Sequence, residues 1–213
     1  MSGSNSYKVV EGDIITCVGC EWEGSLGFYI EPDKAVTNKH VIPNVGHKVL
    51  HRTEPWKNGR EIGVAIKTVK WRNPTFFDWL AYILIGRPIP GNKVDATLIQ
   101  LNKDVAVERA FNLPTKIAEP KKGAKLYKRG RTTGVTEGLI QEESIDVWVG
   151  MGDGRRLLFT DVYMFSNRTM AGDSGGPNYT DDGIVGLTFA GPERGEYGFG
   201  IKARNIAEAF GLG

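Results

Sequence analysis

A single serine, Ser174, lies in the glycine-rich stretch "TMAGDSGGPNY", residues 169–179. Gly172, Gly175 and Gly176 surround it, and each glycine costs backbone entropy in a folded element, so such a run indicates a chain that turns tightly or approaches another group closely. A serine hydroxyl becomes a nucleophile only when a base removes its proton. The stretch therefore predicts acyl-transfer chemistry if the chain also supplies a base, and is otherwise a tight turn.

The chain contains three histidines that could serve as this base. His47 and His51 have polar neighbours, and we expect both to be exposed, whereas His40 lies near the end of the apolar run "KAVTNKHVI". A histidine base needs an acid that orients its ring. Asp95 opens "DATLIQL" and Asp78 opens "DWLAYILI", and either acid could instead cap a turn or strand end. The residues alone leave both acids open.

Most apolar runs in the chain are short and end in turn residues, as in "GSLGFYI", "LAYILIG" and "GIVGLTFAG". With 28 glycines and 10 prolines between them, they predict many short antiparallel strands, in a barrel or a sandwich. Only "NIAEAFG" near the end is typical of a helix. A polar segment with two prolines, at about residues 102–125, is expected to connect two lobes.

Three segments, "AVTNKHVI", "VDATLIQL" and "GDSGGP", occur in that order and resemble the histidine, aspartate and serine motifs of chymotrypsin-like (trypsin-like) serine peptidases. A fourth, "KRGRTTGVTEG", resembles a strand pair of bacterial members such as lytic endopeptidases. This resemblance implies an all-β fold of two six-stranded antiparallel barrels with a short C-terminal helix. We expect an N-terminal barrel at residues 1–105, a connection at 106–125 and a C-terminal barrel at 126–213.

The resemblance also implies roles for individual residues in a serine endopeptidase. Ser174 would attack the peptide carbonyl, His40 would transfer the proton, and Asp95 would hold the imidazole ring. The backbone N–H groups of Gly172 and Ser174 would form the oxyanion hole. A serine esterase, or a peptide-binding protein that keeps the fold without turnover, remains an alternative.

Substrate binding in this family implies an edge at Phe189, Ala190 and Gly191 that pairs with an extended peptide. The base of the side-chain pocket would fall on Arg168, unless this arginine is a surface cation. No aspartate stands there, so a preference for basic side chains is not expected. An acidic or a small apolar preference stays open.

Asp173, which precedes the nucleophile, needs a cation if it is buried. We predict that Arg131 of "GRTTG" pairs with it, as the bacterial resemblance implies; the alternative is that Arg131 lies on a solvated strand. The chain begins "MSGSNSY", with no evident activation peptide, and we expect it to be active as translated.

Composition narrows the remaining functions. A net charge of +2 is too small for a dedicated nucleic-acid surface. No apolar run is long enough to span a membrane, and no signal peptide is visible, so we expect a polypeptide as the partner, no membrane partner, and a cytoplasmic or virion-associated location.

The pairs Cys17/Cys20 and His47/His51 form a zinc-like pattern, but the gap between the cysteine pair and the histidine pair is longer than zinc sites usually have. We therefore expect two ordinary thiols, no metal and no cofactor.

Overall fold

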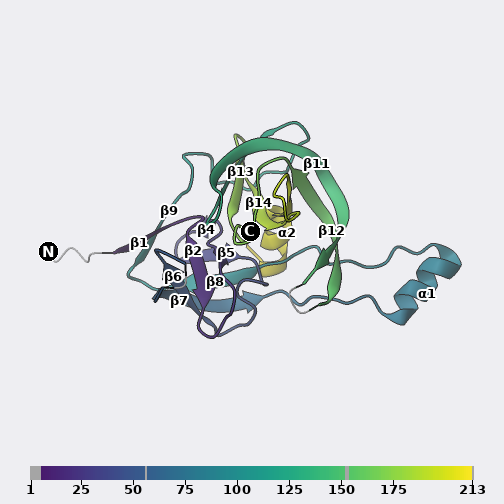
Figure 1. Ribbon diagram of the computed structural model, residues 1–213, viewed down its shortest axis with the longest axis horizontal. Helices are drawn as coiled ribbons and strands as arrows, with labels where there is room; N and C mark the ends of the chain where they lie inside the picture. Colours follow the sequence, from purple (N-terminus) through teal and green to yellow (C-terminus); the bar gives the residue numbers. More distant parts are fainter. Residues whose placement is uncertain (1–5, 56, 152–153, 213) are drawn as a thin grey trace.

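The computed structural model describes residues 6–55, 57–151 and 154–212. Two antiparallel β units dominate the fold (Figure 1). The first is a seven-stranded sheet in the order β3-β2-β6-β7-β8-β5-β4. Its strands are β2 (Ile14–Cys17), β3 (Gly24–Ser25), β4 (Tyr29–Ile30), β5 (Lys34–Thr37), β6 (Lys48–Arg52), β7 (Arg60–Thr68) and β8 (Thr97–Leu101).

The second unit is a closed six-stranded barrel in the order β10-β11-β12-β15-β14-β13. Its strands are β10 (Lys125–Gly130), β11 (Gly134–Gly150), β12 (Arg156–Phe165), β13 (Pro177–Thr180), β14 (Gly183–Ala190) and β15 (Gly198–Lys202). Helix α2 (Ala203–Phe210) follows β15 and packs on β14. A parallel pair, β1 (Tyr7–Val10) with β9 (Val105–Glu108), ties the start of the chain to the end of the first unit.

One hydrophobic core joins the two units. Phe28, Val36 and Leu98 of the first unit belong to the same buried cluster as Phe159 and Phe189 of the barrel. Each fully buried side chain of this size stabilises the fold by about 1.5–3 kcal/mol relative to its exposed state. The shared core therefore fixes the two units against each other and fixes any site that draws residues from both.

The predicted fold class is confirmed, because the chain is mostly β, with two curled sheets and a short C-terminal helix. The first sheet contains seven strands rather than the six that we expected; two of the seven, β3 and β4, are only two residues long.

The run predicted as the strand "LAYILIG" is instead part of helix α1 (Phe76–Ile85). Thr75 and Asp78 form a capping box: the Asp78 N–H donates to Thr75 Oγ1 at 3.3 Å, and the Thr75 N–H donates to the Asp78 carboxylate at 2.8 Å. Gly86 ends the helix in the left-handed conformation, with φ 65°. These caps satisfy backbone groups that a helix end leaves open, and so they select helix over strand.

Candidate active site

His40 and Asp95 meet where two neighbouring strands begin and end. His40 follows β5, Asp95 precedes β8, and these antiparallel strands pair Thr37 with Thr97. Asp95 is fully buried, and its Oδ2 lies 2.5 Å from His40 Nδ1 while its Oδ1 accepts the His40 N–H at 3.2 Å. With Nδ1 as the donor to the carboxylate, His40 Nε2 is the ring atom left to act as an acceptor.

The competing acid, Asp78, has a different place. It lies in the first turn of α1, where its carboxylate accepts from Thr75 and pairs with Arg72 at 2.8 Å. Of the two acids that the sequence offers, the structure places Asp95 against His40 and Asp78 at a helix cap.

Asn38, two residues before His40, binds the backbone of Asp95. It was not singled out from the sequence. It is fully buried, and its Nδ2 donates to the Asp95 carbonyl oxygen at 2.7 Å. The carboxylate of Asp95 and its backbone are therefore both fixed by the loop that carries His40. The available signal in the sequence was an asparagine that follows an apolar strand and precedes the histidine by two residues.

Ser174 lies in the loop between β12 and β13 of the barrel, pressed against the first sheet. Its carbonyl oxygen accepts the Ser25 N–H at 2.8 Å. The next residue, Gly175, has φ 90°, and a side chain there would collide with Thr37 Oγ1 at the end of β5. Glycine at 175 thus lets the serine loop approach the strand that leads to His40.

The Ser174 hydroxyl points toward the end of β14 in this structure. Among the described residues it makes one hydrogen bond, a long one of 3.5 Å to the carbonyl oxygen of Phe189. Such a weak contact leaves the hydroxyl free to rotate. Catalytic hydrogen bonds are often long in structures without substrate and shorten when it binds.

Side chains from outside the serine loop orient the peptide group that carries the Gly172 N–H. Thr132 Oγ1 donates to the Ala171 carbonyl at 2.7 Å, so in a trans peptide the Gly172 N–H points the other way. Ser25 Oγ donates to the next carbonyl, that of Gly172, at 2.8 Å. Gly172 has φ 95°, a conformation that glycine adopts without strain.

The Ser174 N–H is oriented in the same manner. The Asp173 carbonyl accepts the Gly176 N–H at 2.9 Å, so the Ser174 N–H of that peptide group points away from this turn. Within the part of the chain that the structure describes, neither the Gly172 N–H nor the Ser174 N–H donates to another protein group. Two unpaired backbone donors beside a serine can bind an anionic oxygen.

Asp173 pairs with Lys128, which corrects the predicted pair with Arg131. Both side chains are fully buried, and Lys128 Nζ lies 2.9 Å from Asp173 Oδ2. The carboxylate also accepts the N–H groups of Met170, Thr132 and Thr133, each at 3.0 Å, and the Thr133 hydroxyl at 2.8 Å. Burial favours the neutral acid, but Lys128 and these donors outweigh it and hold the pKa of Asp173 below its ordinary value.

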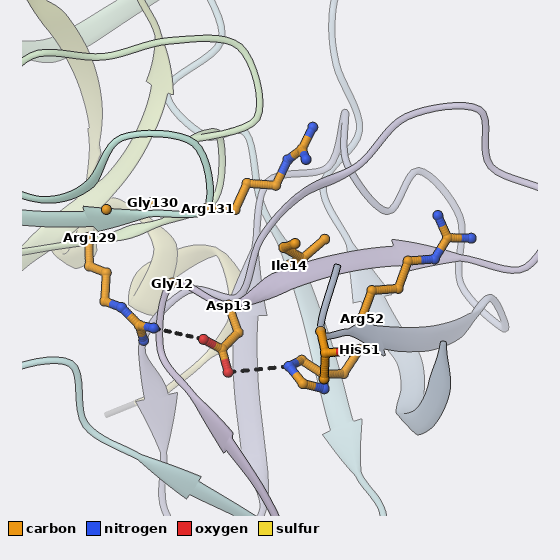
Figure 2. Close-up of a pocket in the computed structure, with 10 residues that line it drawn as sticks. Gly12, Asp13, Ile14, His51, Arg52, Arg129, Gly130 and Arg131 are labelled. Atoms are coloured by element: carbon orange, nitrogen blue, oxygen red, sulfur yellow. Dashed lines mark hydrogen bonds and ion pairs between the residues drawn. The ribbon is translucent and has the colours of Figure 1, made fainter. Parts of the chain in front are cut away.

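Arg131 pairs with Glu23, with Nη1 and Oε2 at 3.0 Å. It lines a cavity of about 350 Å³ between the first sheet and the barrel, where Asp13 pairs with Arg129 at 2.8 Å and with His51 at 3.2 Å (Figure 2). Figure 2 shows Arg131 directed away from Asp13. Side chains alternate between the two faces of β10, and Leu126, Lys128 and Gly130 are its buried positions. This alternation explains why Lys128, and not Arg131, is the partner of Asp173.

The expected substrate-binding residues lie at the end of β14. Phe189 is buried against Phe159, with ring centroids 4.9 Å apart, so its side chain belongs to the core and only its backbone reaches the site. Ala190 is the last residue of β14 and pairs with Phe199.

Arg168 is exposed, and its guanidinium lies 3.4 Å from Met170 Sδ. The next residue, Thr169, is buried. Its atoms lie 2.6 and 3.3 Å from the positions where side chains would begin on Gly198 and Gly191. Thr169 is therefore the buried polar side chain between Gly191 and Gly198, and nothing in the sequence distinguished it from its neighbours.

The two cysteines form a disulfide between Cys17 and Cys20, which corrects the expectation of two ordinary thiols. His47 Nδ1 lies 3.0 Å from Cys17 Sγ, whereas His51 contacts Tyr7 and Asp13 instead. Only three members of the zinc-like pattern therefore lie together. Metal binding by cysteine needs thiolates, and the disulfide form has none.

A family model described as Trypsin matches residues 15–209 of the chain. Among solved structures, the chain is similar to Thermobifida fusca protease A, with 19% identity, 96% of this chain and 97% of that chain covered, and a TM-score of 0.66. It is also similar to Cellulomonas bogoriensis chymotrypsin, with 20% identity, 96% and 97% covered, and a TM-score of 0.63. A homologue of alpha-lytic protease, N4, gives 18% identity, 96% and 98% covered, and a TM-score of 0.64. No curated protein matches.

Proposed function

The chain belongs to the trypsin family of serine proteases, hydrolases that act on peptide bonds, and on this premise we propose that it is an endopeptidase with a Ser174–His40–Asp95 catalytic triad. The observation that carries the proposal is the contact between buried Asp95 and His40 Nδ1. His40 follows β5, and Gly175 packs against Thr37 at the end of that strand. The contact with Asp95 leaves His40 Nε2 available to the residue beside Gly175, which is Ser174.

In the first half of the reaction, the Ser174 hydroxyl leaves the Phe189 carbonyl and donates to His40 Nε2. Its Oγ then forms a bond to the substrate carbonyl carbon while His40 takes the proton. Asp95 stays ionised and stabilises the imidazolium. His40 next gives the proton to the leaving nitrogen, the carbon–nitrogen bond breaks, and the acyl group remains on Ser174.

In the second half, water attacks the acyl carbon, His40 takes a proton from the water, and the Ser174 oxygen leaves with that proton. Both tetrahedral intermediates carry an oxyanion that the unpaired N–H groups of Gly172 and Ser174 would bind. Each such donor is worth about 3 kcal/mol of transition-state stabilisation. Lys128 acts as a positioning residue, because it fixes the carboxylate of Asp173, the residue between Gly172 and Ser174 in the chain.

We further propose that the substrate is an extended peptide that pairs with the backbone of Phe189, Ala190 and Gly191. Thr169, which is buried between Gly191 and Gly198, would then line the pocket for the substrate side chain rather than exposed Arg168. This uncharged environment fits small side chains better than basic ones, because a buried ammonium group without a carboxylate is costly.

The test is cleavage of a diverse peptide library by the wild-type chain, Ser174→Ala and His40→Ala. We expect the wild type to cleave after small uncharged residues and both variants to lose turnover by at least about 10⁴-fold. Circular dichroism should show the wild-type fold in each variant. Cleavage by Ser174→Ala at a rate near that of the wild type would contradict the proposed nucleophile.

A further inference from the structure

Helix α1 exposes large apolar side chains to water along its whole length. Phe77 and Ile85 are each 76% exposed, Ile83 is 73% exposed, and none of the residues of α1 is buried. Burying a side chain of this kind is worth about 1.5–3 kcal/mol, so leaving a whole helix exposed forgoes a large stabilisation. The exposure therefore indicates that something outside this chain covers α1.

The apolar surface of α1 surrounds the helix. The four residues from Tyr82 to Ile85 are consecutive and exposed, and consecutive residues of a helix point about 100° apart, so together they reach every side. A helix that docks in a protein groove needs only one apolar stripe, whereas a helix that is apolar all round is typical of a protein core or a membrane.

The position of α1 gives it access to a surface outside the protein. Figure 1 shows the helix at the far end of two chain segments, to one side of both β units. Its aromatic contact with the barrel is a stack of Trp79 on Trp148 of β11, with ring centroids 6.0 Å apart. At the opposite end of α1, Ile83, Leu84 and Ile85 are 69–76% exposed.

The charges around α1 favour an anionic surface. Residues 69–94 contain four basic residues, Lys70, Arg72, Arg87 and Lys93, against one acid, Asp78. This segment has a net charge of +3, whereas the rest of the chain has a net charge of −1. The acid is itself neutralised, because its carboxylate pairs with Arg72 at 2.8 Å and caps the helix.

We propose that α1 inserts past the headgroups into one leaflet of an anionic lipid bilayer and holds the chain at the membrane surface. Lipid surrounds an inserted helix, and so it covers all faces of α1, whereas a second copy would cover one. The insertion is interfacial: ten residues of helix extend about 15 Å, and a bilayer core is about 30 Å thick. No helix among the described residues is long and apolar enough to span a membrane.

This inference revises the expectation that the chain has no membrane partner, which rested on the lack of a spanning run. It is independent of the proposed peptidase function, because it concerns a segment that contributes no residue to the site.

The test is sedimentation with vesicles of phosphatidylcholine alone or mixed with phosphatidylglycerol, using the full chain. We expect binding to the mixed vesicles that weakens as salt is raised. Ile83→Gln/Leu84→Gln should reduce the binding constant by at least about 100-fold, because two buried apolar side chains are lost. Arg87→Gln should reduce it about fivefold, the effect of one basic residue near an anionic surface.

The matched control is Val135→Gln/Leu139→Gln, which changes two exposed apolar residues of β11 away from α1 and should bind as the wild type does. Thermal unfolding of each variant checks that the fold is kept. Failure of the wild type to sediment with the mixed vesicles would overturn the proposal. So would a wild-type dimer in solution that Ile83→Gln/Leu84→Gln converts to a monomer, since the occupant would then be a second copy.

Discussion

Replacing Lys128 by methionine removes the ammonium group that lies 2.9 Å from Asp173 while nearly keeping the volume of the side chain. Both side chains are fully buried, so water cannot take the place of the lost partner. The carboxylate keeps its hydrogen bonds from Met170, Thr132 and Thr133. Lys128→Met therefore leaves the buried carboxylate of Asp173 with its hydrogen bonds but without a positively charged partner.

Removing one partner of a buried ion pair typically costs about 3–5 kcal/mol. We expect a loss at the lower end, about 3 kcal/mol, because four hydrogen bonds to Asp173 remain. In a protein of this size, 1 kcal/mol shifts the melting temperature by about 2–4 °C, so Lys128→Met should melt roughly 6–12 °C lower. Asp173 lies between Gly172 and Ser174, and so kcat should also fall, by at least about tenfold.

Thermal unfolding and steady-state kinetics on a peptide substrate measure both effects. Lys125→Met is the matched control, because Lys125 lies on the same strand and pairs with Glu137 at 2.7 Å on the exposed surface. Exposed pairs contribute at most about 1 kcal/mol, and this control should melt within about 4 °C of the wild type. If Lys128→Met behaves like Lys125→Met, Lys128 does not hold the site in shape.

Three further changes test other parts of the account. Asp95→Asn should lower the turnover rate by about 10⁴-fold, whereas Asp78→Asn should leave it unchanged and weaken only the α1 cap; exchanged results would mean that the acid is misassigned. Because the pKa of Asp173 is lower in the folded chain than its unfolded value of 3.8, its contribution to stability should be complete above about pH 5 and lost as the pH falls through and below about 4; urea unfolding across this range that shows no such loss would contradict the pairing. Reducing the Cys17–Cys20 disulfide should lower stability by about 2 kcal/mol, as expected for a short loop; unfolding that is unaffected by a reductant would show that the bond does not constrain the chain.

The order of the histidine, aspartate and serine motifs predicted the double-barrel fold, because these motifs tie catalytic residues to particular strand ends. Helix α1 was missed because a short apolar run does not distinguish a strand from a helix. The capping signal was present in the sequence, with Thr75 and Asp78 three residues apart and Gly86 following the run. The full run, Phe76–Ile85, is also longer than most strands.

The partner of Asp173 was harder to predict, because it depends on a contact between residues 45 positions apart in the chain. Period-two alternation along β10 places Lys128 on the same face as Leu126, which was the available evidence that this lysine points inward. The Cys17–Cys20 disulfide was missed because two cysteines three positions apart can also remain as thiols, and their spacing alone does not decide between the two states.

The most direct test of the proposed triad is reaction with a serine-directed phosphonate, followed by mass spectrometry to locate the adduct. A phosphonate reacts with a serine only when a base activates it and donors bind the developing oxyanion, so the experiment examines His40, Ser174 and the backbone of Gly172 together. We predict one adduct per chain, on Ser174, and no adduct in His40→Ala. A wild-type chain without an adduct on Ser174, or a His40→Ala variant that is labelled as fast as the wild type, would contradict the account.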